Sequence, residues 1–142
     1  MKQFIVKNRL AALFLVALAC ISISCNNKED HEDGDYVPGM VVVKFKEYAV
    51  DRFDLSVTNG SVFTAVNELD NALSGLPAHD MSRVFPAHPN EAYEQRAREQ
   101  GLHLYYSIYF DEKTPVKKAI RTLIALDFVE SAEPSYIVEI IH

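Results

Sequence analysis

Histidines are the side chains of this sequence best suited to acid–base catalysis or metal binding, and they are scattered. His79 directly precedes Asp80, whereas His88 and His103 stand alone farther along the chain. A histidine catalyst or metal site needs partners at a defined spacing, and no serine stands in the Gly-x-Ser-x-Gly context of an exposed nucleophile. We therefore expect no enzymatic activity, no metal site and no cofactor.

The chemistry that the sequence does favour is lipid attachment at a cysteine. Three basic residues and an apolar run over residues 10–23 precede Cys25, and the run is short for a membrane-spanning helix. We expect residues 1–24 to be a lipoprotein signal peptide and Cys25 to be acylated, with Cys20 as the alternative. A secretory leader with an incidental cysteine is the competing interpretation. Since the sequence has no other cysteine, disulfides and thiolate metal sites are excluded.

An acidic segment over residues 25–35 follows the leader and forms the expected tether. It resembles the surface-export signals of some Gram-negative lipoproteins, which implies a location at the outer membrane or cell surface, with the lipid as the only membrane contact. The leader has three basic and no acidic side chains, so the remaining chain is more acidic than the overall net charge of −6. This balance argues against nucleic acid as a partner, because phosphates require a basic surface.

Residues 102–110 alternate between two sets of side chains, as a strand in a sheet does. The set expected to face the core is Leu102, Leu104, Tyr106, Ile108 and Phe110. The other set, His103, Tyr105, Ser107 and Tyr109, would then lie on the opposite face of the sheet. Tyrosine is favoured in interface cores, so these four residues are candidates for binding a partner. Equally, tyrosines simply favour strands.

Strands and helices alternate along the rest of the chain. Residues 40–46 alternate as a strand, and apolar residues spaced four and three apart from Val62 to Leu76 predict a helix beginning near Ser61. The remaining predicted elements are a strand over 81–86, a polar helix over 90–100, a helix from Pro115 and a strand over 128–136. Residues 47–59 are predicted to be mostly loop.

This order predicts an α+β fold of the ferredoxin-like βαββαβ type. Each of the two main helices has one apolar stripe, so both would cover one face of a four-stranded antiparallel sheet. Right-handed connections place the first and third strands in the middle of that sheet. The other face of the sheet would then stay uncovered.

Four segments resemble the N-terminal prodomains of subtilisin-like serine peptidases, closest to the fervidolysin type. They are residues 36–46 (YVPGMVVVKFK), 83–86 (RVFP), 98–106 (containing GLHLYY) and 129–136 (VESAEPSY). The resemblance implies a domain over residues 36–142 that binds a subtilisin-like peptidase as an inhibitor or as a folding chaperone. In that family the uncovered sheet face docks on two surface helices of the peptidase.

The end of the chain is apolar and extended. It consists of Ile137, Val138, Glu139, Ile140, Ile141 and His142. Such a segment can add as a strand in a peptidase cleft, with its main chain supplying affinity and alternate side chains filling pockets. The resemblance implies that His142 lies nearest the catalytic serine of the peptidase. The alternative is that residues 137–141 extend the edge strand of the domain itself.

The catalytic motifs of subtilases do not occur in this sequence. We therefore expect a stand-alone module directed at a peptidase, and not a peptidase. Two alternatives stay open, because a shared fold does not fix a function. One is a surface lipoprotein that serves adhesion or assembly, and the other is a remnant of a truncated subtilase.

Overall fold

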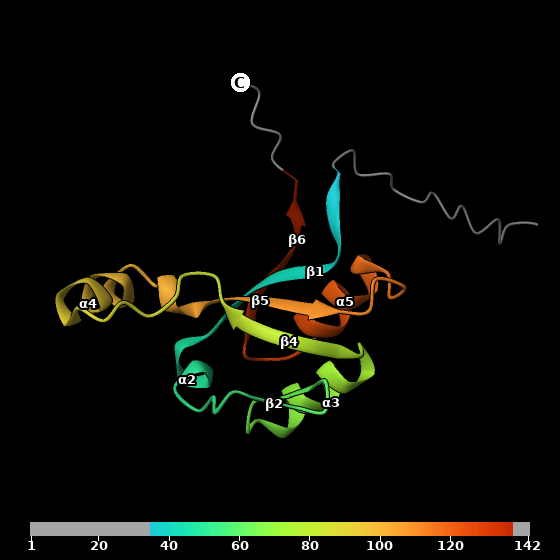
Figure 1. Ribbon diagram of the computed structural model, residues 1–142, viewed down its shortest axis with the longest axis horizontal. Helices are drawn as coiled ribbons and strands as arrows, with labels where there is room; N and C mark the ends of the chain where they lie inside the picture. The colour runs from blue at the N-terminus through green and yellow to red at the C-terminus, as the bar shows by residue number, and fades with distance from the viewer. Residues whose placement is uncertain (1–34, 138–142) are drawn as a thin grey trace, which may run out of the picture. The chain divides into compact units, whose positions relative to one another are not determined.

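The computed structural model describes residues 35–137 and shows an α+β fold, as predicted (Figure 1). Its strands are β1 (Tyr36–Phe45), β2 (Ser56–Thr58), β3 (Ser61–Phe63), β4 (Ala78–Arg83), β5 (Tyr105–Phe110) and β6 (Val129–Tyr136). Its helices are α2 (Glu47–Val50), α3 (Asn67–Gly75), α4 (Glu91–Glu99) and α5 (Val116–Ile124), with a 3-10 turn η1 (Leu102–Leu104). Among these residues no helix has the length and apolar character needed to cross a membrane.

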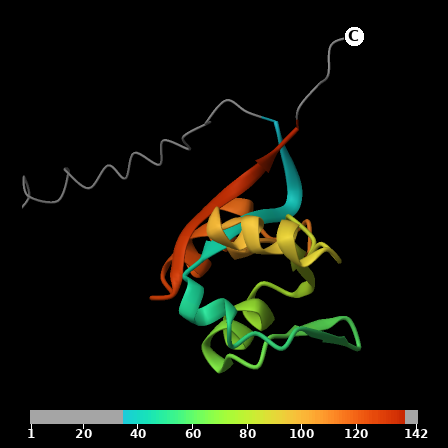
Figure 2. The ribbon, with the colours of Figure 1, turned by 90° about the vertical axis from the view of Figure 1, so that its left-hand side faces the viewer.

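Four strands form the main sheet in the order β4-β5-β1-β6, and every neighbouring pair is antiparallel. β1 and β5 therefore occupy the middle, where the first and third strands of the predicted order were expected. Their register pairs Val41 with Ile108 and Val43 with Tyr106. Near its start β1 bends, so that its first residues run beside the end of β6, where Tyr36 pairs with Tyr136 (Figure 2).

The alternation predicted for β1 is confirmed by burial. Val41, Val43 and Phe45 on β1 are fully buried, while Val42 and Lys44 between them are partly exposed. Burying each large apolar side chain contributes about 1.5–3 kcal/mol, so this pattern fixes which face of β1 turns inward.

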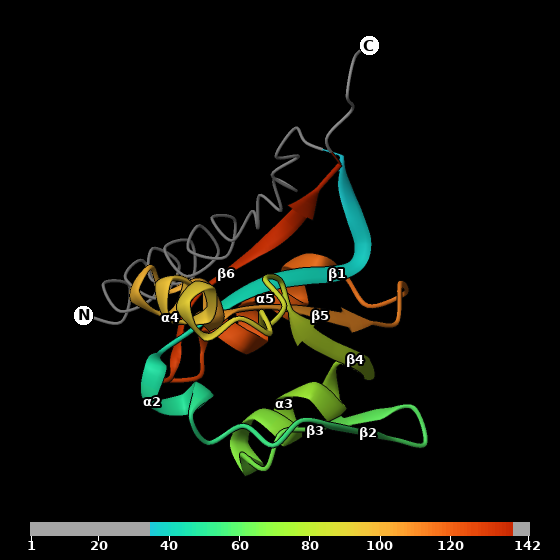
Figure 3. The same cartoon turned by 60° about the vertical axis from the view of Figure 1, so that its left-hand side comes forward.

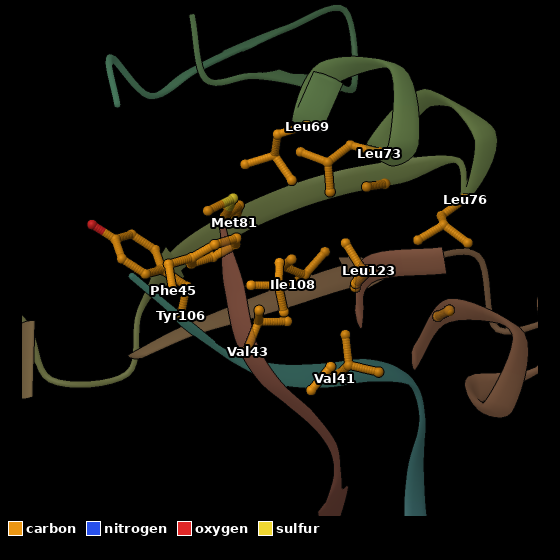
Figure 4. Close-up of a cluster of buried hydrophobic side chains, with 14 of the residues drawn as sticks. Val41, Val43, Phe45, Leu69, Leu73, Leu76, Met81, Tyr106, Ile108 and Leu123 are labelled. Atoms are coloured by element: carbon orange, nitrogen blue, oxygen red, sulfur yellow. The ribbon is translucent and has the colours of Figure 1, made fainter. Parts of the chain in front are cut away.

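The helices α3 and α5 supply the rest of a single core. Leu69 and Leu73 of α3 and Leu123 of α5 belong to the same buried cluster as Val41 and Ile108 (Figure 4). Val116 and Ala119 are also buried and Ile120 is partly buried, which confirms the predicted apolar stripe of α5. This stripe recurs every three or four residues, as a helix with one buried face requires.

The predicted helix over residues 61–76 is too long at its start. Residues 61–63 are strand β3, and the helix begins only at Asn67. Val62 is buried as expected, but it reaches the core from this strand. β2 and β3 form a small hairpin beside α3 (Figure 3). β2 lies in the region predicted to be mostly loop, and β3 lies at the start of the predicted helix. The sequence signal for the hairpin is Asn59-Gly60, a pair typical of tight hairpin turns.

The strand predicted over residues 102–110 is also shorter than expected. Leu102, His103 and Leu104 form η1, and β5 begins at Tyr105. Gly101, with a φ of 71°, precedes this turn and reverses the chain after α4. Because the chain forms this turn after the left-handed Gly101, Leu102 and Leu104 do not continue the strand alternation and are not part of the sheet. β4 lies at 78–83, earlier than the predicted 81–86.

Candidate functional site

The candidate site lies on the sheet face that points away from the core, which we call the outer face. Its central residues are Met40, Val42 and Lys44 on β1 and Tyr105, Ser107 and Tyr109 on β5. Cross-strand register pairs Met40 with Tyr109 and Lys44 with Tyr105, so the two tyrosines lie beside β1 side chains. Both tyrosines are partly exposed, as are Met40, Val42 and Lys44.

Tyr105 contacts both an aromatic and a charged side chain on this face. Its ring makes an edge contact with Phe85, with 6.3 Å between the centroids, and Phe85 is 42% exposed. The Lys44 ammonium lies 5.7 Å from the centroid of the Tyr105 ring, a distance that permits a cation–π interaction. Lys44 Nζ also donates to Glu130 Oε1 at 2.7 Å. This hydrogen bond raises the pKa of Lys44.

These contacts hold an amphipathic surface in a defined geometry. Tyrosine and phenylalanine offer large apolar area with few rotatable bonds, so little entropy is lost when a partner covers them. The Lys44–Glu130 pair is surface exposed, so its own contribution to stability is small, and it serves to orient Lys44 over Tyr105. The outer face therefore offers both apolar area and charged groups to solvent.

Two of the four predicted β5 residues do not offer their side chains to a partner. His103 is only 2% exposed because it lies in η1, where the alternation of the strand does not apply. The prediction that His103 points out of the sheet is therefore wrong. Ser107 does face outward, but it is 6% exposed. Ser107 pairs with Val42 of β1 on one side and with Ser82 of β4 on the other, so it lies in the interior of the sheet.

Phe85 was not among the predicted contact residues. It lies two residues after the end of β4, and the predicted strand over residues 81–86 treated it as part of the sheet. Because Phe85 precedes Pro86, its backbone is biased toward an extended conformation. This bias is consistent with the end of a strand, but it does not indicate the direction of the Phe85 ring. Only the contact with Tyr105 reveals that Phe85 belongs to the outer face.

The predicted C-terminal contact segment is described only at its first residue. Ile137 is 55% exposed, and its backbone N–H donates to the Asp35 carbonyl at 2.9 Å. Residues Val138, Glu139, Ile140, Ile141 and His142 lie outside the described residues, as do residues 1–34 with Cys20 and Cys25. Across residues 35–137 no three His, Asp or Glu side chains are grouped as a metal site requires.

Comparisons of the chain with models of known families, with curated proteins and with solved structures give no significant match.

Proposed function

We propose that this chain is a binding module that docks on a subtilisin-like serine peptidase through its outer face. The observation that carries the proposal is the set of aromatic side chains exposed on the outer face: Tyr105 and Tyr109 on the central strand β5, and Phe85, which contacts Tyr105. Aromatic side chains on a rigid element are typical anchors of protein interfaces, where a few residues supply most of the binding energy.

The arrangement of the elements supports the same proposal. The order β4-β5-β1-β6 and the common core of α3 and α5 agree with a ferredoxin-like sandwich, in which both helices lie on one face of the sheet. In this interpretation α2, the β2–β3 hairpin and α4 are additions to that plan. The outer face is then the surface that a subtilase prodomain presents to its peptidase, as the sequence resemblance implies.

The C-terminal segment is the second part of the proposed interface. β6 ends at Tyr136, and the chain continues through the exposed Ile137. In the proposed complex residues 138–142 enter the substrate cleft as an added strand, which blocks access of substrate. Binding of the module therefore inhibits the peptidase, and binding to an unfolded peptidase assists its folding.

Enzyme inhibition tests the proposal. The chain is titrated against a panel of subtilisin-like peptidases, with a chromogenic peptide as substrate. Inhibition at micromolar concentration or below is expected, and deletion of residues 138–142 should weaken it by more than about tenfold, or 1.4 kcal/mol. Adhesion to a surface, or assembly with other envelope proteins, would take the place of this function if no peptidase of the panel were inhibited.

We also propose that Cys25 carries the lipid that anchors the module at the outer membrane or cell surface. An apolar leader precedes Cys25 and an acidic segment follows it, as in exported lipoproteins. The variant Cys25→Ala should appear in the soluble fraction, whereas Cys20→Ala should stay with the membrane. Membrane fractionation of cells that express each variant provides the measurement, and retention of Cys25→Ala in the membrane would contradict the assignment.

A further inference from the structure

A small polar pocket lies at one end of the core, apart from the outer face. It has a volume of about 240 Å³ and is lined by Val50, Asp51, Arg83, Arg98, His103 and Tyr106. Arg83 pairs with Tyr106 in the sheet register, so its side chain leaves the sheet on the core side. Figure 4 shows the Tyr106 hydroxyl directed away from the aliphatic side chains of the core. This volume is many times the roughly 10–15 Å³ that a site needs in order to hold one water molecule.

The Arg83 guanidinium uses only one of its two hydrogen-bonding edges. Its Nη1 atom donates to Glu94 Oε1 at 3.0 Å. Its Nε and Nη2 atoms are buried and have no partner among the described residues. These two N–H groups lie parallel on one edge of the guanidinium, which is the geometry that grips two oxygens of one carboxylate. Leaving charged donors buried and unpaired costs free energy, so an acceptor that binds Nε and Nη2 of Arg83 would stabilise this site.

His103 provides a second, independent sign of a missing ligand. Its side chain is 3% exposed, and neither ring nitrogen has a hydrogen-bond partner in the described part of the chain. The nearest acidic group is Glu47, whose Oε1 lies 3.8 Å from Nε2 and whose side chain is 72% exposed. A neutral imidazole always has one N–H to donate. His103 therefore adds a donor to the pocket that Arg83 lines.

The charges around the pocket disfavour a dianion. Glu94 Oε1 lies 3.0 Å from Arg83 Nη1 and 3.6 Å from Arg98 Nε. Arg98, Asp51 and Glu47 are all exposed, so solvent and salt screen their charges. The net positive charge at the pocket is therefore too small to favour a phosphate dianion, and the hydrogen-bonding geometry of Arg83 selects the ligand.

We propose that this pocket binds a carboxylate, held by the Nε and Nη2 atoms of Arg83 with His103 as an additional donor. Arg98, whose side chain is 55% exposed, attracts the anion at the mouth of the pocket. The site does not depend on peptidase docking. It accepts either a small organic acid or a carboxylate carried by a peptide, since both present the same pair of oxygens.

Nuclear magnetic resonance titration of the full chain tests this site. Sodium acetate is added at constant ionic strength against sodium chloride, and the Arg83 Nε–Hε and His103 amide signals are followed. Both should shift together and saturate. Arg83→Lys keeps the charge but removes the two parallel N–H donors, and it should raise the dissociation constant for acetate by about tenfold or more. Arg98→Gln should raise it by about threefold, and the control Arg96→Gln by less than about twofold, because attraction at a distance is screened.

Further arms of the titration identify the ligand. N-acetyl-dialanine as the free acid should reproduce the acetate shifts, and its C-terminal amide should not. Affinity tenfold above that of acetate assigns the site to a peptide carboxylate, and equal affinity assigns it to a small acid. The proposal is overturned if the acetate shifts fail to saturate, if phosphate saturates the signals and acetate does not, or if Arg96→Gln weakens binding as much as Arg83→Lys. A wild-type-like spectrum of each variant shows that it is folded.

Discussion

At the scale of single residues, Thr64 and Asp70 fix the start of α3. Thr64 is fully buried, and its backbone N–H and its hydroxyl each donate to Asp70 Oδ1 at 2.7 Å. The same hydroxyl accepts from the Val66 N–H at 3.2 Å. Val66, the residue at the helix N-cap, has no side-chain oxygen and cannot cap the helix itself. The hydrogen bonds of Thr64 and Asp70 stabilise the start of the helix in its place.

The variant Asp70→Ala tests the role of this network. It leaves two buried donors of Thr64 without their acceptor, which should lower the free energy of unfolding by about 1–3 kcal/mol. Urea denaturation followed by circular dichroism gives the value. The control is Glu68→Ala, an exposed acidic residue in the same helical turn, which should change stability by less than about 0.5 kcal/mol. Equal effects of the two variants would show that only the charge near the helix start matters.

Glu94 gives a prediction for pH dependence. Its carboxylate accepts from the His88 backbone N–H at 3.1 Å and from Arg83, and these contacts lower its pKa. A lowered pKa in the folded state means that the carboxylate stabilises the fold above its unfolded pKa of about 4.3. This contribution is lost as the pH falls through the lowered value.

The measurement compares the wild type with Glu94→Gln. Urea denaturation at several pH values between 6 and 3 should show the wild type as the more stable protein at pH 6. The difference should shrink steadily toward pH 3. A difference that stays constant over this range would mean that Glu94 acts through its shape and not through its charge.

At the scale of elements, the hairpin and α3 contain two glycines whose substitution should act in opposite directions. Gly60 has a φ of 73° in the β2–β3 turn, and Gly75 ends α3. An added Cβ would meet no atom within 4 Å at either position, so backbone conformation alone decides the outcome.

Gly60→Ala should lower the free energy of unfolding by about 1–2 kcal/mol, because alanine resists a left-handed conformation. Gly75→Ala should raise it by about 0.4–1 kcal/mol, since alanine loses less chain entropy in a helix. Thermal denaturation of both variants, each compared with the wild type, provides the test. A stabilising Gly60→Ala would contradict the turn conformation seen here.

The elements also show how far the sequence alone could lead. Strict alternation identified the buried faces of β1 and β5, because burial of Val41, Val43 and Ile108 is the dominant local signal. The stripe of α5 was equally clear. The hairpin was missed because its strands have only three residues each, too few for a pattern, and only Asn59-Gly60 signals the turn.

The candidate site likewise contains residues that the sequence could place and residues that it could not. Tyr105 and Tyr109 could be placed on the outer face from the period of the strand. His103 could not be placed, because a single turn after Gly101 rotates it into the core, and no short-range pattern reports this. The pocket of Arg83 and Arg98 is assembled from residues on β4 and α4, and such long-range proximity leaves no trace in one sequence.

At the scale of the whole described unit, the sheet has two unlike faces. The inward side chains of the sheet pack in one core with side chains of α3 and α5, and the outer face carries the tyrosines with the Lys44–Glu130 pair. The first residues of β1 and the end of β6 lie side by side, so Asp35 and Ile137 leave the sheet at the same place. In the proposed complex, the outer face and the segment that continues past Ile137 bind the same peptidase.

The most direct test of peptidase docking is calorimetric titration of the chain with a subtilisin-like peptidase whose catalytic serine is replaced by alanine. Tyr105→Ala and Tyr109→Ala should each weaken binding by about 1–2 kcal/mol, as interface anchors do. Tyr93→Ala is the matched control, because Tyr93 is 57% exposed on α4 and lies off the outer face, and it should bind like the wild type. Loss of affinity confined to the two β5 tyrosines is the predicted result. Absence of binding at micromolar concentration, or an equal loss for Tyr93→Ala, would contradict docking through the outer face.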